Sequence, residues 1–98
     1  MDAPRPEVVI YTKATCPYCA AALRLLRDRG VQPREIDLLE EPERRDEMIR
    51  RSGRTTVPQV FIGGRSVGGY DDLAELDRRG ELDRLLAVAP EGERVGGG

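Results

Sequence analysis

The only two cysteines of the chain are Cys16 and Cys19, in a Cys-Pro-Tyr-Cys run that follows the apolar residues 8–11. We expect Cys16 at the N-cap of a helix and Pro17 at its first position, where a proline loses no hydrogen bond. Free amides then point toward the Cys16 sulfur, and the helix dipole favours its thiolate. Such positions bring a thiol pKa from about 8.5 to roughly 3.5–7.5. The motif predicts redox chemistry with Cys16 as the attacking sulfur.

The second cysteine has a different predicted role. Cys19 lies three residues after Cys16, a spacing that puts two side chains on one helix face with Cβ atoms about 5–6 Å apart. It can therefore form a disulfide with Cys16 after local adjustment. Because Cys19 lies one turn inside the helix, we expect it to be more buried and more protonated, and to act second as the resolving thiol.

The cysteine pair has three other interpretations. A structural zinc site needs four ligands, and the chain has no further cysteine and no histidine, so no metal is expected. A structural disulfide would normally constrain a long loop, whereas this one would close a single turn. Two incidental buried cysteines are an alternative, but proline at the first helical position argues against it.

Lys13 is the only lysine among 16 basic residues, and it lies three residues before Cys16. An ammonium group is a compact point charge, unlike the broad guanidinium group of arginine. Lys13 is thus predicted to favour the thiolate or to hold a substrate carboxylate. A solvated surface lysine is the alternative, since most lysines are exposed.

Length and charge limit the class of protein. The 98 residues suffice for one domain, which we assign to residues 1–89, with a polar, glycine-rich tail at 90–98 predicted to be disordered. The net charge of −2 comes from mixed charges without a basic stripe, so no nucleic-acid partner is expected. No segment approaches the roughly twenty apolar residues of a membrane helix, and no signal core is present. We expect a soluble, cytoplasmic monomer, in which a cysteine pair is catalytic or metal-binding rather than a permanent disulfide.

The hydrophobic pattern predicts an α/β fold. Strands are expected at 7–12, 33–38, 59–62 and 65–67, and helices at 17–29, 41–52, 70–78 and 81–88. Gly30, Gly53 and Gly80 are expected to end helices, and Gly63-Gly64 to form a hairpin turn. The order βαβαββα implies a small four-stranded mixed sheet flanked by helices on both faces. A Cys-x-x-Cys after the first strand of such a unit is typical of a thioredoxin-like redox fold.

Three segments of the chain, 11–19, 54–62 and 67–73, also resemble the signature segments of dithiol glutaredoxins. The resemblance runs from about Val8 to Leu86 and is strongest to bacterial glutaredoxins of the Cys-Pro-Tyr-Cys type. It implies an enzyme, a glutathione-disulfide oxidoreductase, with glutathione as co-substrate. Its implied clients are glutathionylated or disulfide-containing proteins, with ribonucleotide reductase as one candidate, and glutathione reductase acts indirectly through oxidised glutathione.

The resemblance also implies a glutathione site. Pro58 would be a cis-proline facing the active site, which leaves the backbone N–H and C=O of Val57 to pair with the cysteinyl part of glutathione like an added strand. Tyr18 would line the groove beside the sulfur. From the residues alone, the ordinary start of a strand is the alternative for Val57-Pro58.

Charged ends of glutathione would be held by other positions. The resemblance implies that the backbone amides of Gly69 and Tyr70 meet the γ-glutamyl carboxylate, and that Asp71 or Asp72 meets its ammonium. Lys13 and Arg45 would bind the glycine carboxylate. A plain turn at Gly68-Gly69 and a helix-capping role for the aspartates are the alternatives, because short acidic residues favour first turns.

Two functional alternatives stay open. One is a redoxin that thioredoxin reductase recycles and that donates electrons to ribonucleotide reductase; its lack of glutathione-site residues would distinguish it. The other is a non-enzymatic iron–sulfur carrier, in which two protomers share a cluster through Cys16 and two glutathiones. Pro17 disfavours the carrier, since cluster-binding relatives generally have glycine or serine after the first cysteine.

Overall fold

A four-stranded mixed sheet forms the centre of the fold in the computed structural model, which describes residues 6–87. The strands are β1 (Val8–Thr12), β2 (Arg34–Asp37), β3 (Gln59–Ile62) and β4 (Arg65–Gly68), in the spatial order β2-β1-β3-β4. Strands β1 and β2 are parallel, and β3 runs antiparallel to both β1 and β4. The predicted thioredoxin-like α/β fold is confirmed.

The helices are α1 (Pro17–Asp28), α2 (Arg45–Ser52), α3 (Tyr70–Arg78) and α4 (Glu81–Ala87). The prediction of one helix over 41–52 is wrong in its first part, where a separate 3₁₀ turn, η1 (Pro42–Arg44), precedes α2. The Arg44 amide bonds to the Glu41 carbonyl at 2.9 Å and the Arg45 amide bonds to the Pro42 carbonyl. These bonds join residues three apart, as in a 3₁₀-helix, because the chain turns tightly at Pro42 before the α-helix begins.

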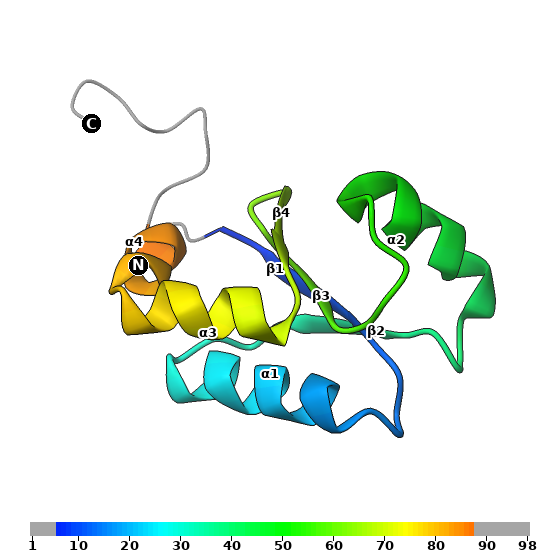
Figure 1. Cartoon of the computed structure of the whole chain (residues 1–98), viewed down its shortest axis with the longest axis horizontal. Helices are drawn as coiled ribbons and strands as arrows, with labels where there is room; N and C mark the ends of the chain where they lie inside the picture. The colour runs from blue at the N-terminus through cyan, green and yellow to red at the C-terminus, as the bar shows by residue number, and fades with distance from the viewer. Residues whose placement is uncertain (1–5, 88–98) are drawn as a thin grey trace, which may run out of the picture.

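Helices cover both faces of the sheet, with α1, α3 and α4 on one side and α2 on the other (Figure 1). Alternate residues of the buried strands point to opposite faces, so β1 and β3 each contribute to both cores. The first core joins strand residues to α1, α3 and α4: Val8, Ile10, Ala22, Leu26, Val60, Ile62, Leu73, Leu82 and Leu86. The second joins strand residues and Leu38 to α2: Val9, Tyr11, Ile36, Leu38, Met48 and Phe61.

Glycines allow the abrupt reversals that the short elements require. Gly63 and Gly64 have φ angles of 60° and 85°, the pair of positive values that a type I′ hairpin between β3 and β4 needs. Gly53 ends α2 with a φ of 75°, as predicted from its position after the last apolar residue of that helix.

The C-terminal tail at 90–98 and the domain limits at residues 1 and 89 lie outside the described residues. Within residues 6–87, none of the helices combines the length and the apolar character that crossing a membrane would require.

Helix α1 is held over the sheet by Leu26, whose side chain is fully buried. We expect Leu26→Ala to lower the free energy of unfolding by about 2–5 kcal/mol, because it removes buried methyl groups and leaves a cavity. Urea unfolding followed by circular dichroism measures this change. Leu39→Ala is the matched control, since Leu39 is 56% exposed; equal losses in the two variants would contradict this packing.

Candidate functional site

The first turn of α1 positions the Cys16 sulfur. Cys16 is the N-cap, with φ −94° and ψ 116°, and Pro17 occupies the first helical position. The Cys19 amide donates a hydrogen bond to Cys16 Sγ at 3.3 Å. The Cys16 amide is fixed in turn by the Lys13 carbonyl at 3.0 Å. The sulfur thus lies at the amide-rich, electropositive end of a helix, which suits a nucleophilic thiolate.

Cys19 lies in a different environment from Cys16. Its side chain is 2% exposed, whereas Cys16 is partly exposed. Burial, as the main cause, raises the pKa of Cys19 from 9.0 to about 12, and the neighbouring Cys16 and the charge of Glu35 also raise it. The backbone of Lys13 opposes this shift. The expectation that Cys19 is the more buried and more protonated thiol is confirmed.

The segment before β3 faces Cys16 from across the site. The Cys16 thiol donates a long hydrogen bond to the Val57 carbonyl, with 3.9 Å between sulfur and oxygen. The Val57-Pro58 peptide bond is cis, as predicted. A Cβ atom at Gly69 would lie 3.3 Å from the Pro58 carbonyl oxygen, so the start of α3 approaches this segment closely. Three chain regions therefore meet around the sulfur.

A groove of about 300 Å³ lies where these regions meet. Its wall includes an aromatic pair, because the rings of Tyr18 and Tyr70 have centroids 6.1 Å apart and Tyr18 is 61% exposed. The groove is lined by Tyr18, Arg54, Thr56, Val57, Pro58, Gln59, Gly69, Tyr70, Asp71 and Asp72. Its dimensions suit a small molecule or an extended peptide segment.

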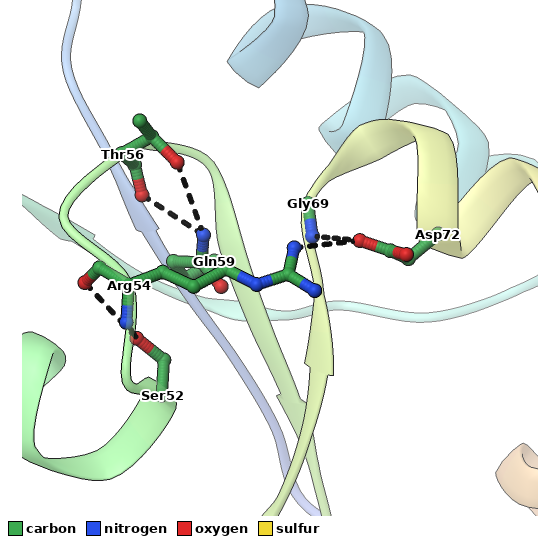
Figure 2. A network of polar contacts seen from close by, with 6 residues as sticks. All are labelled: Ser52, Arg54, Thr56, Gln59, Gly69 and Asp72. Carbon is green, nitrogen blue, oxygen red and sulfur yellow. Dashed lines mark hydrogen bonds and ion pairs between the residues drawn. The ribbon is translucent and has the colours of Figure 1, made fainter.

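A network of polar contacts joins residues that line the groove (Figure 2). One carboxylate oxygen of Asp72 accepts a hydrogen bond from the Gly69 amide at 3.0 Å and pairs with Arg54 Nη1 at 2.8 Å. The contact with Arg54 is the main cause, and that with the Gly69 amide the second, of a pKa of Asp72 that lies below its usual value. Asp72 therefore caps α3, and the Gly69 amide that was predicted to meet a substrate carboxylate already has a carboxylate partner.

The loop before β3 has its own internal bonds, also drawn in Figure 2. The buried side chain of Gln59 donates through Nε2 to the Thr56 carbonyl at 3.0 Å. The Arg54 amide bonds to Ser52 Oγ at 3.0 Å. Gln59 Oε1 is buried and has no hydrogen-bond partner in the described part of the chain. These contacts fix the loop that carries Val57 into the site.

Most residues predicted for the site line this groove, but Cys16, Cys19, Lys13 and Arg45 do not. Lys13 is exposed in the turn before Cys16, and Arg45 is exposed at the first position of α2; neither is part of the groove lining, and their roles stay predictions. Sequence reasoning missed Arg54, Thr56 and Gln59 as site residues. All three lie inside the segment 54–62 that carries the family resemblance, and this was the available signal.

The described residues contain no cluster of three or more histidine, cysteine or acidic side chains that could hold a metal ion. Among the acidic residues of the groove, Asp72 already accepts the Gly69 amide as a helix cap and forms an ion pair with Arg54.

Comparison with known proteins gives consistent matches. The family model described as Glutaredoxin matches residues 8–67. The chain is 56% identical over 80 residues to Glutaredoxin 3 of Escherichia coli strain K12, which covers 82% of this chain and 96% of that protein.

Solved structures agree in fold. The solution structure of glutaredoxin from Brucella melitensis matches with a TM-score of 0.75 and 50% identity, over 88% of this chain and 94% of that one. The crystal structure of a buckwheat glutaredoxin–glutathione complex matches with a TM-score of 0.77 and 32% identity, over 83% of this chain and 76% of that one.

The raised pKa of Cys19 predicts a slow reaction with alkylating agents. In a Cys16→Ser variant, we expect the rate of Cys19 alkylation by iodoacetamide to rise about tenfold per pH unit through pH 10 without a plateau, because burial keeps the thiol protonated. Mass spectrometry of quenched samples measures the rate.

The same variant unfolded in urea is the control, and its rate should level off near pH 9. The same pKa shift makes folding stability depend on pH. The unfolded chain loses the Cys19 proton at a lower pH than the folded chain does, so folding stability falls as pH rises from about 9 toward 12. A plateau near pH 9 in the folded variant would contradict the buried environment of Cys19.

Proposed function

Because this chain belongs to the glutaredoxin family, we propose that it reduces protein–glutathione mixed disulfides and protein disulfides through Cys16, with Cys19 as the resolving thiol. Glutaredoxins are glutathione-dependent thiol–disulfide oxidoreductases with a Cys-x-x-Cys active site. The observation that carries the assignment is the contrast between the two thiols: Cys16 is partly exposed at a helix N-terminus, and Cys19 is buried with a pKa of about 12.

The reaction with a glutathione mixed disulfide needs only Cys16. Its thiolate attacks the glutathione sulfur, the protein–glutathione S–S bond breaks, and the protein thiolate leaves and takes up a proton. A second glutathione thiolate then attacks the glutathione sulfur bound to Cys16, which releases the Cys16 thiolate and oxidised glutathione. The sulfur of the incoming glutathione is oxidised, the protein sulfur is reduced, and one disulfide replaces another, so electrons balance.

A protein disulfide requires the second thiol. Cys16 attacks one sulfur and becomes linked to the client, and Cys19 then loses its proton, attacks Cys16 Sγ and expels the client as a dithiol. Two glutathiones reduce the resulting Cys16–Cys19 disulfide. Because the high pKa of Cys19 leaves little thiolate at neutral pH, a glutathione mixed disulfide on Cys16 should persist long enough for a second glutathione to reach it.

The groove is the proposed glutathione site. The relative from buckwheat was solved as a glutathione complex, and this chain has the corresponding fold. We assign the cysteinyl backbone of glutathione to Val57 and its aromatic wall to Tyr18 and Tyr70. The γ-glutamyl ammonium is assigned to Asp71, which lines the groove and is exposed, in preference to the ion-paired Asp72.

The remaining assignments complete the proposal. Lys13 and Arg45 are assigned to the glycine carboxylate, and the amide of Tyr70 to the γ-glutamyl carboxylate, since first-turn amides lack intrahelical partners. We propose a cytoplasmic monomer that passes oxidised glutathione to glutathione reductase, with glutathionylated proteins as clients and ribonucleotide reductase as a candidate client. The relation to Escherichia coli Glutaredoxin 3 supports the bacterial type.

Replacing each cysteine separates the two reactions. We expect Cys16→Ser to abolish turnover of a glutathione mixed disulfide, because it removes the nucleophile. We expect Cys19→Ser to keep that turnover and to lose reduction of a protein disulfide, because the resolving thiol is absent. NADPH consumption coupled through glutathione and glutathione reductase measures the first activity, and insulin reduction measures the second.

A control assay replaces glutathione and glutathione reductase by thioredoxin reductase, which tests the alternative that thioredoxin reductase recycles this protein. Recycling of the oxidised protein by thioredoxin reductase, with no activity from glutathione, would contradict the proposed function. A folded Cys19→Ser protein without turnover of the mixed disulfide would overturn the roles assigned to the two cysteines.

A further inference from the structure

We propose that Glu35, whose carboxylate is held by Thr12, is a positioning residue that slows the attack of Cys19 on disulfides at the active site. This inference rests on the proposed function and deepens it, because it assigns control over the resolving step to a side chain outside the segments that carry the family resemblance. Thr12 Oγ1 donates a hydrogen bond to Glu35 Oε2 at 2.8 Å, which joins the end of β1 to β2.

Glu35 and Thr12 lie on the sheet face that α1 covers. Successive residues of a strand point to opposite faces, and Ile36 belongs to the core under α2, so Glu35 points to the other face. Ile10, the partner of Glu35 in the parallel register, belongs to the core beneath α1. Thr12, two residues after Ile10, shares that face and is 1% exposed. The bonded pair therefore lies on the side of the sheet where α1 carries Cys19.

The Cys19 thiol reaches the same end of β1. Burial is the main cause that raises the pKa of Cys19, and the backbone of Lys13, which directly follows Thr12, opposes it. The charge of Glu35 also raises this pKa, as does Cys16 on the same helix as Cys19. A negative charge near a thiol disfavours its thiolate. Glu35 therefore opposes loss of the Cys19 proton from the side of the sheet, and Cys16 from the side of the helix.

Thr12 keeps this charge in position. Glu35 is an exposed residue of the edge strand β2, and a carboxylate that turned into water there would be screened from a buried thiol. The hydrogen bond from the buried Thr12 hydroxyl ties the carboxylate to the sheet. Because buried hydroxyls need a hydrogen-bond partner, this contact is retained while the protein is folded.

The charge of Glu35 acts on the first event of the resolving step. Cys19 releases its proton to water, its thiolate attacks Cys16 Sγ, and the S–S bond between Cys16 and glutathione breaks. A Cys16–Cys19 disulfide forms, and the glutathione thiolate leaves and takes up a proton. A charge that keeps Cys19 protonated lengthens the life of the glutathione adduct on Cys16, which favours its reduction by a second glutathione.

The first test measures the resolving step directly. The glutathione adduct of Cys16 is formed at acidic pH, the solution is brought to neutral pH, and acid quenching with mass spectrometry gives the rate constant for loss of the adduct. We expect Glu35→Gln to speed this loss about threefold; the gain is modest because thiolate nucleophilicity falls as the thiol pKa falls. Thr12→Val, which frees the charged carboxylate into solvent, should give a smaller gain.

The second test does not involve glutathione. In a Cys16→Ser background, we expect Glu35→Gln to speed alkylation of Cys19 by iodoacetamide at neutral pH about threefold. Glu35→Asp keeps the charge and should stay within about twofold of the unsubstituted protein in both tests. Glu7→Gln is the matched control, since Glu7 is an exposed glutamate at the end of β1 opposite Thr12, and it should leave both rates unchanged.

Unchanged rates in Glu35→Gln would overturn the inference. Slower loss of the adduct would also overturn it, since Glu35 would then accept the Cys19 proton rather than help to retain it. Where the adduct forms, faster alkylation without faster loss of the adduct would mean only that Cys19 has become more exposed, which overturns it too. Failure of the proposed function is distinct, since Cys16 would then not take up glutathione in the first test, whereas alkylation of Cys19 would still respond to Glu35→Gln.

Discussion

The position at which α1 begins controls both sulfur atoms of the site. Because Pro17 can only stand at the start of a helix without losing a hydrogen bond, Cys16 is left at the N-cap, where the Cys19 amide reaches its sulfur at 3.3 Å. The same helix start places Cys19 one turn further on and under the surface, where burial raises its pKa to about 12. One helix boundary thus produces an accessible nucleophile and a protonated second thiol from two identical side chains.

The groove beside Cys16 depends on contacts between segments that are distant in the sequence. Val57 faces the sulfur from the loop before β3, and Arg54 joins the same loop to α3 through Asp72. The buried Gln59 and the partly exposed Ser52 bond the loop to itself at its two ends. A substrate would therefore meet a surface whose backbone and charges are already arranged, with the exposed carboxylate of Asp71 available to it.

Local sequence signals predicted most of the fold. Glycines with positive φ ended helices and formed the hairpin where expected, because few other residues adopt that conformation, and the cap at Cys16 followed from proline chemistry. The 3₁₀ turn before α2 was missed, since Pro42 is compatible with the first turn of either helix type. The role of Arg54 could not be predicted, because its partner lies 18 residues away and only the folded loop brings them together. Helix α3 begins at residue 70 as predicted, and Asp72, at its third position, caps it through the Gly69 amide.

The most direct test of this account is a crystal structure of the Cys19→Ser protein with glutathione linked to Cys16 as a mixed disulfide. The account predicts that the cysteinyl backbone of glutathione pairs with Val57 and that its γ-glutamyl end lies between the first turn of α3 and Arg54. Glutathione bound to Cys16 but lying outside this groove, or in it with the γ-glutamyl end directed away from α3, would contradict the account.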